Sequence, residues 1–325
     1  MPPQQVIALF GPTGVGKTAV ALALARRLRA RGEDPVAVSA DALQVYAGLD
    51  TLTGAAGPAE RAQLEHRLLS FVPLQETFSA GRYAALAHAE IDGLLAAGRR
   101  PIVVGGTGLY LRAALTELSM LPPPAEGVRE RWSAELERRG SAGLHALLAT
   151  RAPELADTIQ ATDGRRVVRA LELLDSGVSS HAAARQGAPS RSELWTAETR
   201  HPTLLAGLVM ERAALYAQIE ARVDAMVAAG AGAEVRRAAA AGASATARQA
   251  LGFEDLLAGD VEAMKRRTRH YARRQLTWMR KLAGVLVIDV TDRGADAVAA
   301  EIEARLEQRP SADGGGFRTR PRTGT

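Results

Sequence analysis

The chain has 325 residues, with 41 Lys or Arg against 36 Asp or Glu, and therefore a formal net charge of +5 at pH 7. It contains no cysteine, which excludes disulfides and thiolate metal sites and suits a reducing compartment. There is neither a charged-then-apolar leader nor an uninterrupted apolar run of about 18 residues, so we expect a cytoplasmic protein without a membrane span.

The first predicted strand, Val6–Phe10, runs into a glycine-rich loop. Residues 11–18 read Gly-Pro-Thr-Gly-Val-Gly-Lys-Thr, and the stretch from Ala19 to Arg31 is rich in helix formers. This is the G-x-x-x-x-G-K-[ST] pattern in the strand, loop and helix context that it requires. In such a loop, backbone N–H groups surround an anion at the positive end of a helix. The pattern therefore predicts a polyphosphate site; the ordinary alternative is a plain glycine turn.

Within this phosphate loop, Lys17 supplies a compact charge and the Thr18 hydroxyl is placed to hold Mg2+. Lysine is rare in a chain that otherwise uses arginine, since only Lys17, Lys265 and Lys281 occur. A point charge fits a pocket where a planar guanidinium would not. The predicted phosphate-binding residues are Gly11, Thr13, Gly14, Gly16, Lys17 and Thr18, with Thr18 also the metal ligand.

Further apolar runs at 36–39, 102–104, 204–210 and 285–290 alternate with helical stretches. This pattern indicates an α/β fold, with a P-loop-type parallel sheet that carries helices on both faces. In such sheets ligands bind beyond the carboxyl ends of the strands. The phosphate loop, Asp41 and the Gly-Gly-Thr-Gly segment 105–108 each follow a strand, so we expect them to meet in one crevice.

The domain organisation follows from where the strand signal stops. From the prolines at 122–124 to about residue 200, apolar spacing indicates helices only. We therefore expect a helical insert at 118–200 and a catalytic core formed by 1–117 and 201–308. The tail, 309–325, is rich in Gly, Pro and Arg, lacks an apolar stretch to bury, and is expected to be disordered.

Three polar residues at the predicted crevice have both a chemical and an ordinary interpretation. Asp41 is placed either to bind Mg2+ or to take a proton, unless it only caps a following helix. Gln44 could offer its amide to the edge of a base, or be an ordinary solvated glutamine. Thr107 could donate to an oxyanion, or serve only as the N-cap of the next helix.

Two arginine-rich stretches are candidates for contact with RNA. Residues 265–281 are densely basic, with interleaved aromatic residues and very few carboxylates, and on a helix Tyr271 and Trp278 share one face. The cations could meet RNA phosphates while the aromatic face packs on the sheet; the alternative is a solvated arginine face. A smaller cluster, Arg165–Arg169, is either a second contact or a plain helix surface.

Taken in order, these segments are more specific than any one of them. The set comprises residues 11–18, Ser39-Ala-Asp41 with Gln44-Val-Tyr46, Gly105-Gly-Thr-Gly-Leu-Tyr110, Asp163-Gly-Arg-Arg166 with Arg169-Ala-Leu-Glu172, Tyr271-Ala-Arg-Arg-Gln275 with Thr277-Trp278, and shorter matches at 78–79, 215–216, 222–224 and 247–252. From about Val6 to Asp289 the chain resembles the tRNA dimethylallyltransferase family, which prenylates adenosine 37 beside the anticodon.

The resemblance implies the substrates and the roles of the residues. The phosphate loop would hold the diphosphate of dimethylallyl diphosphate together with Mg2+, and Arg212 would join Lys17 there. The amine of a flipped-out adenine would attack the first prenyl carbon, with Asp41 and Thr107 as catalytic residues, Asp41 accepting the proton and Thr107 holding the leaving-group oxygen. Contacts to the tRNA anticodon stem-loop would come from the insert and from Gln44, Arg165, Arg166, Arg169, Gln249, Arg269, Arg273 and Arg274. We expect a monomer.

The chain departs from the family at 52–56, at 66–70 and at Ala42, where serine is usual, and two other interpretations stay open. Where members commonly show Gly-Thr-Ala-Lys-Pro, this chain has Leu-Thr-Gly-Ala-Ala at 52–56, so a frequent cation is missing. A P-loop small-molecule or nucleotide kinase would use the same loop, with Asp41 as Mg2+ ligand or base, but would not need the basic stretches. A nucleotide-switched RNA-binding module is the weaker alternative, since the chain has no asparagine for a guanine-specificity motif.

Overall fold

The fold is described from a computed structural model that covers residues 5–118, 125, 127–179 and 195–308. The chain divides into two compact units, Met1–Glu117 with Ala197–Thr325, and Leu118–Thr196. We describe each unit by itself. The insert predicted at 118–200 and the second unit begin at the same residue, whereas the tail predicted at 309–325 lies outside the described residues.

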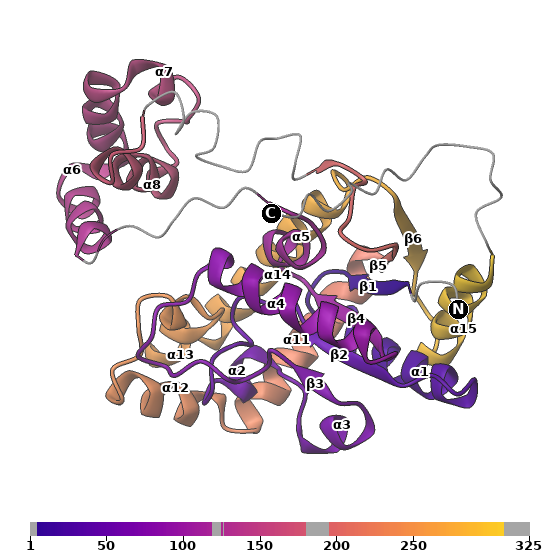
Figure 1. Ribbon diagram of the computed structural model, residues 1–325. Helices are drawn as coiled ribbons and strands as arrows, with labels where there is room; N and C mark the ends of the chain where they lie inside the picture. The colour runs from indigo at the N-terminus through magenta and orange to yellow at the C-terminus, as the bar shows by residue number, and fades with distance from the viewer. Residues whose placement is uncertain (1–4, 119–124, 126, 180–194, 309–325) are drawn as a thin grey trace. The chain divides into compact units, whose positions relative to one another are not determined.

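The strands and α-helices of the first unit are labelled in Figure 1. Its strands are β1 Val6–Phe10, β2 Pro35–Ser39, β3 His66–Arg67, β4 Arg100–Gly105, β5 Thr203–Val209 and β6 Val285–Asp289. Its helices are α1 Lys17–Ala30, α2 Asp50–Thr53, α3 Pro58–Gln63, α4 Ala80–Ala96, α5 Gly108–Leu115, α11 Arg212–Ala228, α12 Ala231–Ala240, the 3-10 helix η1 Ala247–Gln249, α13 Phe253–Leu257, α14 Val261–Met279 and α15 Ala295–Glu307.

The six strands form one sheet in the order β3-β2-β4-β1-β5-β6, and every pairing is parallel. The predicted parallel α/β sheet is therefore confirmed, and each of the five predicted strands is present within two residues of its predicted ends. β3 was not predicted. It has only two residues, so it carries no apolar run that a sequence pattern could detect.

The central strand explains why the sheet must be covered on both sides. All five side chains of β1 are buried, as expected when helices pack on both faces. Ile7 and Leu9 belong to one apolar cluster with residues of α1, α11 and α15. Helices α4 and α5 pack on each other and on β4. The sheet is thus a buried platform whose strand ends carry the loops.

The strand register brings three of those loops to one edge. Phe10 at the end of β1 pairs with Gly105 of β4, and Ser39 at the end of β2 pairs with Val104. The order β2-β4-β1 therefore places the segments after these strands side by side, as predicted. The approach is close, because a Cβ on Gly105 would come within 2.2 Å of the Ala40 carbonyl oxygen. Glycine is needed at this position for lack of space.

The second unit is helical in its described part. Its helices are α6 Val128–Arg151, α7 Pro153–Ala156 and α8 Gly164–Asp175. The span α6 is interrupted at Gly140, whose backbone is not helical (φ 69°, ψ 169°), so it consists of two helical segments joined at a kink. The core of this unit includes Trp132, Leu144 and Leu171. Over the described residues of both units, no helix combines the length and apolarity that crossing a membrane requires.

Candidate active site at the carboxyl edge of the sheet

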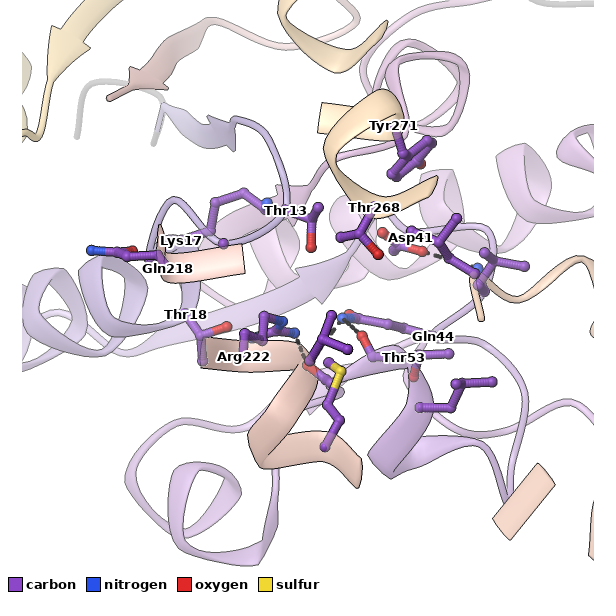
Figure 2. Close-up of a pocket in the computed structure, with 18 of the residues that line it drawn as sticks. Thr13, Lys17, Thr18, Asp41, Gln44, Thr53, Gln218, Arg222, Thr268 and Tyr271 are labelled. Carbon is purple, nitrogen blue, oxygen red and sulfur yellow. Dashed lines mark hydrogen bonds between the residues drawn. The ribbon is translucent and has the colours of Figure 1, made fainter. Parts of the chain in front are cut away.

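A cavity of about 460 Å³ opens where the phosphate loop, the segments after β2 and β4, and helices α11 and α14 meet (Figure 2). Its polar lining includes Thr13, Lys17, Thr18, Asp41, Gln44, Thr53, Glu60, Gln218, Arg222, Thr268, Tyr271 and Gln275. Its apolar lining includes Leu43, Leu52, Val104, Val223, Met226, Leu251 and Met264. One cavity thus offers both cations and an apolar wall.

The phosphate loop has the backbone that its sequence predicts. Gly14 and Gly16 have φ of 85° and 90°, in the left-handed region that favours glycine, and α1 begins at Lys17. The first N–H groups of α1 have no acceptor within the helix and point to this end. Thr13, Gly14, Gly16, Lys17 and Thr18 line the cavity. Gly11 does not; a Cβ there would lie 2.9 Å from the Leu208 carbonyl oxygen, so it packs against β5.

Lys17 is folded back onto its own loop. Its Nζ donates to the carbonyl oxygens of Gly11 and Pro12, each at 2.9 Å. Burial lowers the pKa of Lys17 to about 8; the Asp41 carboxylate opposes this shift and Arg222 adds to it. A cation held by carbonyl groups in a site that disfavours its charge is suited to bind an anionic ligand.

Asp41 faces the same cavity from the end of β2. Its Oδ1 accepts from the backbone N–H of Leu43 at 3.0 Å, which closes a short turn, and no helix begins there. The helix-capping alternative therefore does not hold. Within the described residues, Oδ2 has no hydrogen-bond partner. The carboxylate is oriented by one oxygen and can accept a proton or a metal contact with the other.

Gln44 lies beside Asp41 in a turn and not on a helix. Its Nε2 donates to the carbonyl oxygens of Thr53 and Gly54 at 3.2 and 3.3 Å. Both amide hydrogens are thereby used, and Oε1 is left as the acceptor that the side chain can offer. An acceptor at this position suits an N–H donor such as an exocyclic amine.

Thr107 follows β4 and occupies the N-cap position of α5, but its side chain makes no capping hydrogen bond. Its Oγ1 instead accepts from the backbone N–H of Ala42 at 3.4 Å and lies 3.2 Å from the hydroxyl of Tyr271. Thr107 is thus the N-cap residue by position, as the alternative predicted, but its side chain does not cap the helix. Thr107 contacts two neighbours of the cavity but is not among the residues that line it.

The cavity contains an arginine that the sequence interpretation did not assign. Arg222 lines it from α11, and its Nη2 donates to the Gly54 carbonyl oxygen at 3.2 Å. Its Nε is buried and lacks a partner among the described residues, and burial lowers its pKa. In Figure 2 the side chains of Arg222 and Gln44 approach the same backbone beside Thr53. A Cβ on Gly54 would lie 1.8 Å from Nη2, so this segment leaves room for the guanidinium.

Arg212, the residue assigned by resemblance, is placed differently. It is the first residue of α11, exposed, with its guanidinium 5.4 Å from the centre of the Tyr216 ring, and it does not line the cavity. Its role on a diphosphate stays a prediction. A signal for Arg222 was present in the Arg222-Val-Asp224 match, but only the fold shows which arginine of α11 faces the phosphate loop.

The comparisons with known proteins agree with this geometry. Residues 44–282 match the family model described as IPP transferase. The chain is 41% identical over 287 residues to the tRNA dimethylallyltransferase of Thermobifida fusca, covering 85% of this chain and 87% of that protein. It is also 41% identical to the enzyme of the same name from Anaeromyxobacter dehalogenans, covering 93% and 100%. The chain belongs to the IPP transferase family.

Solved structures show the same fold. The full-length tRNA isopentenylpyrophosphate transferase of Bacillus halodurans is 31% identical, with a TM-score of 0.65 and coverage of 94% of this chain and 96% of that one. A eukaryotic dimethylallyltransferase acting on tRNA has a TM-score of 0.74 at 23% identity, with coverage of 95% and 81%, and supports the fold alone. The IPP transferase fold therefore extends over most of the chain.

In this IPP transferase family member, more of the positive charge of the basic stretch 265–281 is paired with carboxylates than its local sequence indicates. Carboxylates from other segments pair with several of its cations: Asp224 with Lys265, Asp260 with Arg266, Asp255 with Arg267 and Glu220 with Arg269. Arg273 and Arg274 are exposed and have no ion pair among the described residues. The expectation of few accompanying carboxylates was wrong, because the partners lie far away in sequence or just before the stretch.

The remaining predicted tRNA contacts lie on two other elements of this family member. Arg165 and Arg166 are exposed at the start of α8, whereas Arg169 is half-buried and bonds the buried Glu172 at 3.1 Å. Gln249 is exposed in η1. These positions are accessible in their own units, and their contact with RNA stays a prediction.

Proposed function

We propose that this protein transfers the dimethylallyl group of dimethylallyl diphosphate to the N6 amine of adenosine 37 in tRNA. A bond forms between N6 and the first prenyl carbon, the bond from that carbon to oxygen breaks, and diphosphate leaves with the electron pair. The amine loses one proton. Relatives named tRNA dimethylallyltransferase at 41% identity over most of the chain support this reaction.

The observation that carries the proposal is the mixed lining of one cavity. Lys17 and Arg222 supply positive charge at the phosphate loop, while Leu52, Met226 and Met264 supply an apolar wall. A kinase would use the same positive charge, and its nucleotide base could also pack on an apolar wall, so the relatives named tRNA dimethylallyltransferase are what favour a prenyl donor here. A prenyl diphosphate has a charged end and an apolar end, and it matches both.

The leaving group would be stabilised by groups that are already in place. Negative charge builds up on the diphosphate as the carbon–oxygen bond breaks, so prearranged N–H groups and cations lower the barrier. The N–H groups at the start of α1, together with Lys17 and Arg222, are those donors. Since the buried Nε of Arg222 has no partner in the part of the chain that the structure describes, an anionic oxygen would satisfy it.

Asp41 and Gln44 would act on the adenine. A flipped-out base brings its N6 amine to the cavity, where Oε1 of Gln44 can accept one N–H and the Asp41 carboxylate can accept the proton that is lost. Both side chains are held by hydrogen bonds to the backbone, so they are oriented before the base arrives. General-base assistance of this kind is worth about 10²- to 10⁴-fold.

Mg2+ is part of the proposal, and the residues fit it. No cluster of three or more His, Cys, Asp or Glu side chains among the described residues could hold a metal. Mg2+ does not require one, since it keeps several waters and binds through one or two protein oxygens and substrate phosphates. The Thr18 hydroxyl, which lines the cavity, would supply one such oxygen, and Asp41 would stay free to accept the proton. When bound, Mg2+ would neutralise charge on the diphosphate.

The test is to incubate the protein with Mg2+, dimethylallyl diphosphate and unmodified tRNA, digest the RNA and weigh the nucleosides by mass spectrometry. We expect a prenylated adenosine that disappears when the diphosphate is omitted. The matched control is a tRNA with guanosine at position 37. The absence of a new nucleoside, together with phosphate transfer from ATP to a small acceptor, would replace the proposal by the kinase interpretation.

A further inference from the structure

Gln275 of α14 ties two of the loops at the sheet edge together. Its side chain is 4% exposed; Oε1 accepts from the backbone N–H of Thr13 at 2.8 Å, and Nε2 donates to the Gly106 carbonyl oxygen at 2.8 Å. These partners lie 262 and 169 residues away in sequence. The two ends of the amide are different groups, so the bridge has only one orientation.

The partner segment is shaped to receive this bridge. A Cβ on Gly106 would lie 2.2 Å from Nε2 of Gln275, so any larger residue at 106 would push the amide away. The next residue along the chain is Thr107. Gln275 therefore sets the spacing between the phosphate loop and the segment that carries Thr107.

Tyr271 makes a second contact one helical turn earlier on α14. Its hydroxyl lies 3.2 Å from Thr107 Oγ1, and its side chain lines the cavity. Burial, and to a lesser degree the nearby Asp41 carboxylate, raise the pKa of Tyr271 to about 12, so the phenol keeps its proton at neutral pH. A phenol that keeps its proton can donate to Thr107, whose Oγ1 already faces the Ala42 N–H.

We propose, on the basis of the proposed prenyl transfer, that Tyr271 and Gln275 are positioning residues that hold Thr107 in register with the phosphate loop. With N–H of Ala42 and O–H of Tyr271 donating to Oγ1, both acceptor sites of Thr107 are filled and its own proton is directed to another acceptor. Gln275 places that hydroxyl at a constant distance from the diphosphate. The same turn of α14 carries Arg273 and Arg274 on its exposed side.

This role affects alignment more than binding. The diphosphate keeps its phosphate loop, Lys17 and Arg222 when Tyr271 is changed, whereas a change of Gln275 also releases the Thr13 N–H of the loop. A displacement of a reacting group by about 1 Å can cost on the order of 100-fold in rate. The expected signature is therefore a loss in kcat with little change in the KM for dimethylallyl diphosphate, whereas a merely structural role would lower thermal stability and affect both constants.

The experiment compares Tyr271→Phe and Gln275→Met with the wild-type protein. Single-turnover rates of tRNA prenylation are measured at saturating substrates, together with binding of inorganic diphosphate and the Tm. We expect each variant to lose about 10- to 100-fold in rate. We expect the diphosphate affinity of Tyr271→Phe to change by less than about threefold, because this substitution leaves the phosphate loop, Lys17 and Arg222 in place. Gln275→Met also removes the acceptor of the Thr13 N–H, so it should weaken diphosphate binding as well. Tyr83→Phe is the control, since it removes another buried phenol hydrogen bond, to the Ser39 carbonyl oxygen, and neither Tyr83 nor Ser39 lines the cavity.

A double-mutant cycle with Thr107→Ala separates positioning from packing. If Tyr271 acts through the Thr107 hydroxyl, Tyr271→Phe has little further effect once that hydroxyl is gone. Full additivity of the two changes would overturn the proposal, and so would wild-type rates for both Tyr271→Phe and Gln275→Met. These outcomes leave the proposed function standing; only a wild-type protein that makes no prenylated adenosine would remove it.

Discussion

The cavity and helix α14 both carry cations, but the two regions differ in whether a carboxylate pairs with each cation. In the cavity, Lys17 and Arg222 have lowered pKa values because of burial, and neither has an ion-pair partner among the described residues. On α14, Lys265, Arg266, Arg267 and Arg269 are each paired with a carboxylate. Leaving a buried cation without a counter-charge is costly, so it marks a place where a ligand supplies the charge. Paired surface cations carry much less information.

The largest effect is expected from the carboxylate that faces the cavity cations. Asp41→Ala removes the proposed proton acceptor, and turnover should fall by about 10²- to 10⁴-fold. Binding of tRNA should stay nearly unchanged. Single-turnover prenylation and filter binding of tRNA measure the two quantities separately. Wild-type turnover in this variant would refute Asp41 as the base.

Two arginines of α11, Arg222 and Arg212, are the candidates for binding the diphosphate. Arg222→Gln should weaken binding of inorganic diphosphate by roughly 10- to 100-fold, the value of hydrogen bonds between charged groups in a buried site. Arg212→Gln is the matched variant, with its guanidinium over Tyr216 outside the cavity. Isothermal titration of both variants decides between them. If Arg212→Gln shows the larger loss, the assignment based on resemblance is right and that based on the cavity is wrong.

The pH dependence of diphosphate binding tests the half-buried Lys17. The pKa of Lys17 is lowered to about 8, so in the free protein this side chain loses its charge as the pH rises through about 8, where an ordinary lysine remains protonated. Diphosphate affinity should therefore fall above that pH, by up to tenfold for each pH unit. Because diphosphate itself titrates, Lys17→Met is measured in parallel. If the wild-type protein and Lys17→Met showed identical pH profiles, the loss of diphosphate affinity at high pH would not come from Lys17.

The smallest effect is expected on the outer face of α14. Replacing Arg273 and Arg274 with alanine should weaken tRNA binding and reduce its salt slope by about 0.9 for each RNA phosphate that these arginines neutralise. The paired cations Arg266 and Arg267 provide the matched double variant, and it should change the slope less. Binding is measured from about 50 to 200 mM salt, where the salt dependence is most visible. If both double variants showed equal salt slopes, unpaired arginines would contribute no more to tRNA binding than arginines paired with a carboxylate.

Sequence patterns were sufficient for the features that depend on neighbouring residues. The glycines of the phosphate loop, the strand before it and the helix after it lie within 26 residues of one another, from Val6 to Arg31, and each has its own periodicity or backbone requirement. The position of Asp41 opposite that loop also followed, because parallel strands with short right-handed connections leave little choice about which edge their ends share.

Tertiary structure alone decided which distant side chains complete the site. Gln275 bonds Thr13 across 262 residues, and Arg222 reaches Gly54 across 168. Both residues lie in segments that resemble the family, but chemistry alone does not separate them from solvated neighbours on the same helices, since an amide or a guanidinium is compatible with either environment. The carboxylates of α11 that pair with Lys265 and Arg269 are likewise set by the packing of α11 on α14. Local sequence thus determined the loops that bind the anion, whereas packing between helices determined which charges remain uncompensated beside them.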